Sequence, residues 1–236
     1  MPESSLRLDL HNHTCYSADG LMSPAVLLEA ARAKGIQCLA VTDHNTVRGA
    51  LEAVTLAEND ITLPRVIPGV ELTTDDGEII GLYVWEDIPS GLSLLESVTR
   101  IRGQGGLVYL PHPYALFRRG AISRGERARA AELSDIIEVV NGRALGPDAA
   151  RKARRLARKA GRPAGAGSDA HHEAGVGTAY VTVEAYPSRD ILVQLVAEGT
   201  IDHTLGAREY VANWGMQFRA PITRVRRRFN GELARG

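Results

Sequence analysis

The sequence predicts an α/β protein whose parallel strands form either a β/α barrel or an open, doubly wound sheet. Short apolar runs alternate with segments of helical periodicity along most of the chain, which is typical of repeated βα units. The apolar character of these runs indicates strands that are buried on both faces. No G-x-G-x-x-G motif follows the first run, so the usual argument for a dinucleotide-binding sheet is missing.

The predicted elements are delimited by turn and capping residues. Ser23 and Pro24 mark the start of the first helix, because Ser is a favourable N-cap and Pro fits the first helical position. Asn45 or Thr46 is positioned to cap the second helix. The predicted strands cover residues 6–10, 36–42, 65–72, 78–85, 107–110, 135–140, 162–167, 179–184 and 200–205. The predicted helices cover residues 24–34, 46–59, 93–106, 123–133, 146–160 and 188–199.

The length and composition indicate a single globular domain. The chain has 236 residues, of which 44% are hydrophobic and 24% charged, and β/α barrels of this size commonly form one unit. We therefore assign one domain to residues 1–236. The alternating pattern occupies about 6–205, and 206–236 form a C-terminal extension without periodicity.

The charge balance and the cysteine content exclude several classes of protein. Basic and acidic residues are equal in number, so nucleic acid is a possible partner but not a favoured one. The two cysteines do not have the spacing of a thiolate metal site or a disulfide framework. No signal peptide and no apolar run of about 20 residues is found. We expect a cytoplasmic protein without a membrane partner, and the oligomeric state stays open.

Polar residues gather where the predicted strands end. His11 and His13 follow the first strand, and five of the seven histidines lie at such strand ends. The carboxyl ends of the strands in a β/α barrel converge on one mouth, where these folds carry their chemistry. The residues brought there are His11, His13, Asp19, His44, Glu71, His112, Asp169 and His171.

This residue set predicts a site for more than one metal ion. Imidazole and carboxylate suit Zn, Mn or Fe, and one ion takes about four to six ligands. Eight ligands exceed the need of a single catalytic ion with an open position, so we expect at least two ions bridged by a carboxylate such as Glu71. Two neighbouring ions generate a hydroxide near neutral pH and hold the oxygens of a transferring phosphoryl group.

Three residues are predicted to take part in catalysis. His13 and Asp169 belong to the metal-binding set, and Asp43 directly precedes His44. Asp43 either orients a ligating histidine or caps a helix.

Substrate binding requires positive groups at the same mouth. Arg118 and Arg119 lie in the loop after residues 110–113 together with Tyr114, and Arg143 follows the sixth predicted strand. Arginine binds phosphate bidentately, so these residues are candidates for substrate contacts; the alternative is an ordinary exposed loop. The helix at 146–160 has an apolar stripe and a basic face, as expected of an outer helix with a solvated side.

Five segments, in their order along the chain, resemble the PHP (polymerase and histidinol phosphatase) superfamily. They are DLHNHTCYSADG (9–20), LAVTDHNT (39–46), PGVEL (68–72), LPHP (110–113) and GSDAH (167–171). Each is weak alone, but the set is specific and its resemblance covers roughly residues 6–205. The resemblance implies a distorted (β/α)7 barrel with two or three divalent ions, drawn from Mn, Fe, Zn or Mg.

The resemblance also implies a metal-ligand role for the eight residues named above, position by position. One position departs from the pattern, because many members carry a histidine where this chain has Glu78. Glutamate is also a metal ligand, so the departure leaves the presence of a third ion open.

Most members of the superfamily are phosphoesterases, which makes phosphate-ester hydrolysis the leading hypothesis. The expected substrate is a small phosphomonoester or a nucleotide, attacked by a metal-activated hydroxide. An amidohydrolase-like enzyme is an alternative, although such enzymes usually add a carboxylated lysine and the predicted strands contain no Lys. A metal-binding module without catalytic activity is the third hypothesis. No G-x-S-x-G elbow or G-x-x-x-x-G-K-[ST] phosphate loop is present.

Overall fold

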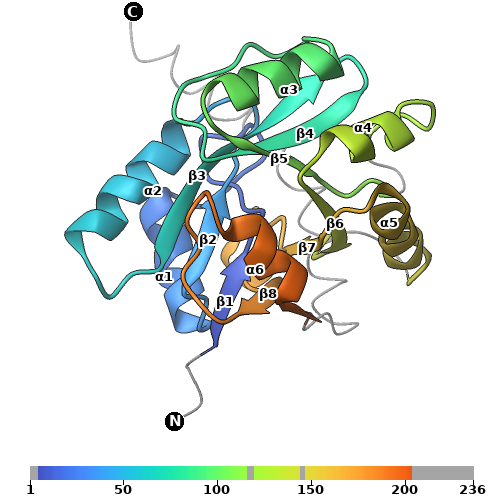
Figure 1. Cartoon of the computed structure of the whole chain (residues 1–236). Helices are drawn as coiled ribbons and strands as arrows, with labels where there is room; N and C mark the ends of the chain where they lie inside the picture. The colour runs from blue at the N-terminus through green and yellow to red at the C-terminus, as the bar shows by residue number, and fades with distance from the viewer. Residues whose placement is uncertain (1–4, 116–119, 144–146, 204–236) are drawn as a thin grey trace, which may run out of the picture.

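A curved sheet that nearly closes into a barrel, with helices around it, forms the protein (Figure 1). The structure, a computed structural model, describes residues 5–115, 120–143 and 147–203. The strands are β1 (Leu6–Asp9), β2 (Cys38–Val41), β3 (Arg65–Thr74), β4 (Gly77–Leu82), β5 (Leu107–Leu110), β6 (Ile136–Asn141), β7 (Ala164–Gly167), β8 (Ala179–Val183) and β9 (Thr200–His203). The helices are α1 (Pro24–Ala33), α2 (Arg48–Asn59), α3 (Leu94–Gly103), α4 (Arg127–Leu133), α5 (Pro147–Ala160) and α6 (Leu192–Glu198), with a short 3-10 turn at Glu173–Gly175.

The sheet mixes parallel and antiparallel strands, so the expectation of parallel strands holds for only part of the sheet. Its order is β7-β6-β5-β4-β3-β2-β1-β8-β9. The neighbours β1–β2–β3 and β5–β6–β7 are parallel, whereas β4 is antiparallel to β3 and β5, and β8 is antiparallel to β1 and β9. Only Asp75 and Asp76 connect β3 to β4, and so short a connection joins antiparallel strands alone.

Backbone hydrogen bonds between the segments after β1 and β7 bring the two sides of the barrel together. The Asp169 N–H donates to the His11 carbonyl at 2.7 Å, and the His13 N–H donates to the Ala170 carbonyl at 2.9 Å. The barrel therefore closes at the carboxyl ends of its strands, where the candidate site lies. The predicted distorted barrel is confirmed.

The interior follows the predicted burial pattern. Every residue of β2, β5 and β6 is buried, which confirms burial on both faces for these three strands. β9 departs from the prediction, because none of its residues is buried. The predicted start of α1 is also confirmed, because the Ser23 side chain accepts a hydrogen bond from the Val26 N–H at 3.3 Å.

The predicted cap of α2 was wrong. The N-cap position is Val47, which makes no side-chain capping bond. Asn45 bonds to the neighbouring strand β3 instead, because its side-chain oxygen accepts a hydrogen bond from the Thr73 N–H at 2.8 Å. Its backbone has a positive φ of 57°. Thr46 accepts only a 3.3 Å bond from the Arg48 N–H. The side-chain oxygen of Asn45 is used for this bond to β3 and does not cap α2.

Two expectations concern other properties of the chain. The C-terminal extension at 206–236 lies outside the described residues. Among the described helices, none has the length and apolar character needed to cross a membrane.

A substitution at Gly81 of β4 would test how tightly α3 packs on the barrel. A Cβ added there would lie 2.7 Å from Val84 Cγ2 and 2.9 Å from Ile101 Cγ1. We expect Gly81→Ala to lower the free energy of unfolding by about 1–3 kcal/mol, the usual cost of overpacking. Urea denaturation measures this change.

Gly103→Ala is the matched control for this test. Nothing lies within 4 Å of the added Cβ at Gly103, which is the last residue of α3. The free energy of unfolding should therefore stay within about 1 kcal/mol of wild type. Equal effects of the two substitutions would contradict the packing argument.

Candidate metal centre

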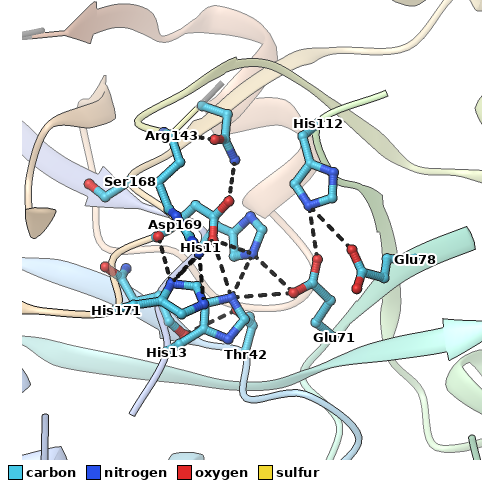
Figure 2. A network of polar contacts seen from close by, with 12 residues as sticks. His11, His13, Thr42, Glu71, Glu78, His112, Arg143, Ser168, Asp169 and His171 are labelled. Carbon is cyan, nitrogen blue, oxygen red and sulfur yellow. Dashed lines mark hydrogen bonds and ion pairs between the residues drawn. The ribbon is translucent and has the colours of Figure 1, made fainter. Parts of the chain in front are cut away.

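The eight predicted ligands lie around the carboxyl-terminal mouth of the barrel, and most converge on one buried cluster. The segment after β1 carries His11, His13 and Asp19, and the segment after β2 carries His44. Glu71 lies within β3, which extends further than predicted. His112 follows β5, and Asp169 and His171 follow β7. Figure 2 shows the imidazoles and carboxylates pointing toward one another.

His11 and His13 turn their Nε2 atoms toward the same point. The two Nε2 atoms are 3.0 Å apart. The Nδ1 of His11 lies 3.1 Å from a Glu138 oxygen, and the Nδ1 of His13 lies 3.1 Å from Ser17 Oγ. A neutral imidazole that donates through Nδ1 keeps a lone pair on Nε2. Two such lone pairs at this distance require a proton or a cation between them.

The orientation of His13 depends on Ser17 and Asp43. Ser17 Oγ donates to Asp43 Oδ1 at 2.7 Å and accepts from the His44 N–H at 2.9 Å. Its remaining lone pair accepts from Nδ1 of His13. Asp43 also accepts two 2.6 Å bonds from the backbone and hydroxyl of Thr14. Asp43 therefore acts on the cluster through Ser17, so its geometry is that of an orienting residue.

Glu71 has the position expected of a bridging carboxylate. Its Oε2 makes no hydrogen bond and lies 3.4, 3.3 and 3.3 Å from ring nitrogens of His11, His13 and His44, respectively. Its Oε1 lies 3.1 Å from Nε2 of His112. Burial raises the pKa of this carboxyl, but the charges and hydrogen bonds of the histidines outweigh burial and hold the pKa well below its usual range. Glu71 is thus an anion that faces four imidazoles.

Glu78, the residue that departs from the family pattern, joins the same cluster from β4. Its Oε1 lies 3.8 Å from Nδ1 of His44, and its Oε2 lies 3.7 Å from Nε2 of His112. A Cβ on Gly120 would overlap the Glu78 carboxylate, at 1.7 Å from Oε2. Glycine at this position therefore leaves the space that the longer carboxylate side chain occupies.

The opposite side of the cluster is formed by Asp169 and His171. Asp169 Oδ1 lies 3.7, 3.5 and 3.5 Å from ring nitrogens of His11, His13 and His171, respectively. The backbone of Asp169 has a positive φ of 53°, which is uncommon for a residue other than glycine and often found at functional sites. Asp19 reaches this side through a 2.9 Å contact with Nε2 of His171.

Two imidazoles of the cluster have pKa values that differ widely. Burial lowers the pKa of His13, but the Asp169 and Glu71 carboxylates outweigh it and raise the pKa to about 9. Burial and the positive charges of His13 and Arg143 lower the pKa of His171 to about 3. Such separation of neighbouring groups is typical of functional sites.

The donor atoms form four overlapping groups that could each hold a metal ion. In each group the atoms lie within 4.8 Å of one another. The groups are His13–His44–His171, His11–His13–Asp169, His11–Glu71–His112 and His44–Glu71–Glu78. Asp19 is in none of them. Nitrogen and carboxylate donors in this mixture fit Zn, Mn or Fe.

The predicted substrate contacts have mixed outcomes. Arg143 lies at the cluster, with Nη1 2.7 Å from a ring nitrogen of His171 and 3.3 Å from Asp169 Oδ1. Arg118 and Arg119 lie outside the described residues. Tyr114 is half-buried and has the Arg127 guanidinium 4.3 Å from its ring centroid, so that ring already has a cationic neighbour.

Sequence reasoning missed Glu138, a buried carboxylate in β6. Its Oε1 accepts from Nδ1 of His11 at 3.1 Å and from the Tyr109 hydroxyl at 3.2 Å. Its Oε2 accepts from the His112 N–H at 2.7 Å and from the Asn141 amide at 2.9 Å. Glu138 therefore fixes the ring of one histidine and the backbone of another. The available signal was a charged residue inside an otherwise apolar strand.

Comparison with known families agrees with this geometry. The PHP domain family matches residues 9–157, and a PHP-associated family matches residues 147–201. The chain belongs to the PHP domain family. Most of its histidines and carboxylates lie in the region that matches the PHP domain, and Asp169 and His171 lie in the region that matches the PHP-associated family.

Known relatives of this PHP protein include uncharacterised proteins and nucleases. The uncharacterised protein MJ0417 of Methanocaldococcus jannaschii is 35% identical over 75% of this chain and 70% of its own length. A 5′-3′ exoribonuclease of Haemophilus influenzae is 36% identical over 41% of this chain and 35% of its own length. The chain thus spans about a third of that nuclease.

A solved structure supports the PHP fold. It is a two-domain protein from Bacteroides vulgatus, described as containing a "predicted PHP-like metal-dependent phosphoesterase". The TM-score is 0.69 at 18% identity, and the match covers 91% of this chain and 70% of that chain. This similarity establishes the shared barrel architecture.

Glu138→Gln should weaken metal binding. Four hydrogen-bond donors surround the two carboxylate oxygens. A glutamine would replace one of these oxygens with an NH₂ group, which cannot accept the hydrogen bonds of the donors that face it. We expect metal affinity to fall by about 10–100-fold, as for other residues that orient a ligating histidine. Competition with a chromophoric chelator measures it.

Glu132→Gln provides the control, because Glu132 is an exposed glutamate on α4. Its metal affinity should equal that of wild type. If Glu138→Gln also bound metal with wild-type affinity, the orienting role of Glu138 would be excluded.

Proposed function

We propose that this protein hydrolyses a phosphate ester, either a small phosphomonoester or a nucleotide, at a centre of two or three divalent ions. The overlap of the four donor groups carries this proposal, because they share His11, His13, His44 and Glu71. Shared ligands are expected where ions lie close together. A pair of such ions, when bound, lowers the pKa of water and neutralises charge on phosphoryl oxygens.

The side chains of this chain supply the framework for that chemistry. Glu71 and Asp169 provide the negative charge that retains divalent cations in a buried site. Ser17 and Asp43 hold His13 with its Nε2 toward the centre, and Glu138 does the same for His11. These hydrogen bonds fix ring orientation before a substrate arrives, which reduces the reorganisation required during the reaction.

Arg143 is proposed to bind the non-reacting oxygens of the phosphoryl group. Its Nη1 contacts both His171 and Asp169, and its side chain is 13% exposed. Guanidinium groups match phosphate geometry and strengthen where water is excluded. The exoribonuclease name of one relative agrees with a phosphate-ester substrate of the nucleotide class.

The amidohydrolase alternative lacks its usual ligand. None of the nine described strands contains a lysine that could be carboxylated to bridge two ions. In this chain Glu71, which faces four imidazoles, would hold the ions at that position instead. A non-catalytic metal-binding module would have the same ligands, and measurement of turnover separates it from the proposed enzyme.

Metal content is the first quantity to measure. Elemental analysis of protein purified without chelator or a histidine tag should find at least two divalent transition ions per chain. Incubation with EDTA should abolish hydrolysis of phosphate esters, and the same metal should restore it. At most one bound ion after incubation with Mn, Fe and Zn would exclude the multinuclear centre.

His13→Ala and Asp169→Ala should abolish turnover while the barrel survives. Both residues lie in the donor group that includes His11, so each substitution removes a buried donor. We expect at least about a thousand-fold loss in kcat/KM for a phosphomonoester, in line with losses on removing essential catalytic groups. Circular dichroism checks the fold.

His203→Ala is the matched control, because His203 is exposed on β9 and belongs to none of the four donor groups. Its activity should equal that of wild type. Retained activity in both cluster variants would exclude the assignment.

A further inference from the structure

The outer surface of α5 carries a dense, one-sided positive charge. Six basic residues and one acidic residue lie on this helix. All six basic side chains belong to exposed residues: Arg151, Lys152, Arg154, Arg155, Arg158 and Lys159. We refer to these six residues as the α5 basic face.

Acidic neighbours do not neutralise the α5 basic face. One ion pair joins Arg151 to Asp148 at 2.9 Å, and both side chains are mostly exposed. Within the part of the chain that the structure describes, no carboxylate lies within 4.0 Å of the other five cations. By contrast, exposed arginines on α1 and α3 pair with glutamates of their own helices, Arg32 with Glu29 and Arg100 with Glu96.

The other side of α5 packs against the barrel. Ala153 and Ala157 are buried, and Leu156 and Ala160 pack partly buried against the core. A helix that binds a membrane surface inserts its apolar side into the lipid boundary. Because α5 has buried that side, the basic face is left for a soluble polyanion.

The position of α5 connects this face with the metal centre. α5 begins at Pro147, six residues after Asn141, whose amide donates to Asp169 Oδ2 at 3.1 Å. From Arg151 to Lys159 the helix rises about 12 Å away from this end. A polyanion lying along α5 would therefore run toward the mouth of the barrel.

We propose that the α5 basic face binds the phosphate backbone of a nucleic acid. Rows of lysine and arginine on one helix face form the electrostatic footprint of backbone binding, which needs no base contacts. The affinity comes from release of counterions, so it falls steeply as salt rises. This inference stands on the charge of α5 and is independent of whether the centre hydrolyses a small ester.

Fluorescence anisotropy of the full metal-loaded chain tests the proposal. The probes are a fluorescein-labelled single-stranded DNA and its duplex, both with phosphorothioate linkages and checked for integrity afterwards. Wild type should bind at least one probe, with an affinity that falls linearly with salt on logarithmic axes. Binding to neither probe at low salt would overturn the proposal.

Arg154→Gln/Arg155→Gln/Arg158→Gln is the decisive variant, because glutamine keeps helix propensity and removes three charges. The plot of log affinity against log salt concentration should have a slope shallower by about 2, because each lost contact with a single strand removes about 0.7. The affinity of this variant at low salt should fall at least about tenfold. Its metal content and its hydrolysis of a chromogenic phosphomonoester should match wild type.

The matched control is Arg32→Gln/Arg100→Gln/Arg102→Gln, which removes three exposed arginines from α1 and α3. It makes the same change in net charge and should bind nearly as wild type. An equal loss in the two triple variants, or no loss in the α5 variant, would overturn the proposal. So would α5-dependent binding to phosphatidylserine vesicles without binding to either oligonucleotide.

Discussion

The structure depends on the mutual compensation of buried charges at the barrel mouth. His11, His13 and Glu71 are fully buried, and their donor atoms lie within 3.4 Å of one another. Burying such groups is costly unless opposite charges and hydrogen bonds satisfy them. Protons on the histidines give partial compensation in the protein alone. A divalent ion does so more completely, so metal binding and stability of the mouth should be linked.

The fold holds these groups together through contacts that are separate from the ligand atoms. Asp9, at the end of β1, accepts hydrogen bonds from the backbone and hydroxyl of Ser168, which precedes Asp169. The segments after β1 and β7 also share backbone hydrogen bonds. The antiparallel strand β4 adds Glu78 to the cluster that contains Glu71 of β3, from a direction that a purely parallel barrel would not provide. The antiparallel departure from a regular barrel is thus part of how the site is assembled.

The sequence predicted the site better than it predicted the supporting contacts. Residues directly after strands, such as His44 and His112, were identifiable because strand ends converge in a barrel. Glu138 was missed because its position within β6 resembles that of core residues, and its role depends on partners from other strands. The cap of α2 failed for the same reason, since Asn45 bonds to Thr73, 28 residues away. Long-range contacts of this kind are absent from local periodicity.

The even balance of charges in the sequence concealed a separation of charge in space. Acidic residues such as Asp9, Glu71 and Asp169 are buried at the mouth, whereas the basic residues of α5 face outward. A partner approaching from solvent meets the exposed charges most directly, because the charges of Glu71 and Asp169 are compensated by neighbouring histidines. Each divalent ion bound at the mouth would add two further positive charges to the chain. The net charge of zero therefore argues less strongly against a polyanionic partner than it first suggests, since recognition depends on the local field of the loaded protein.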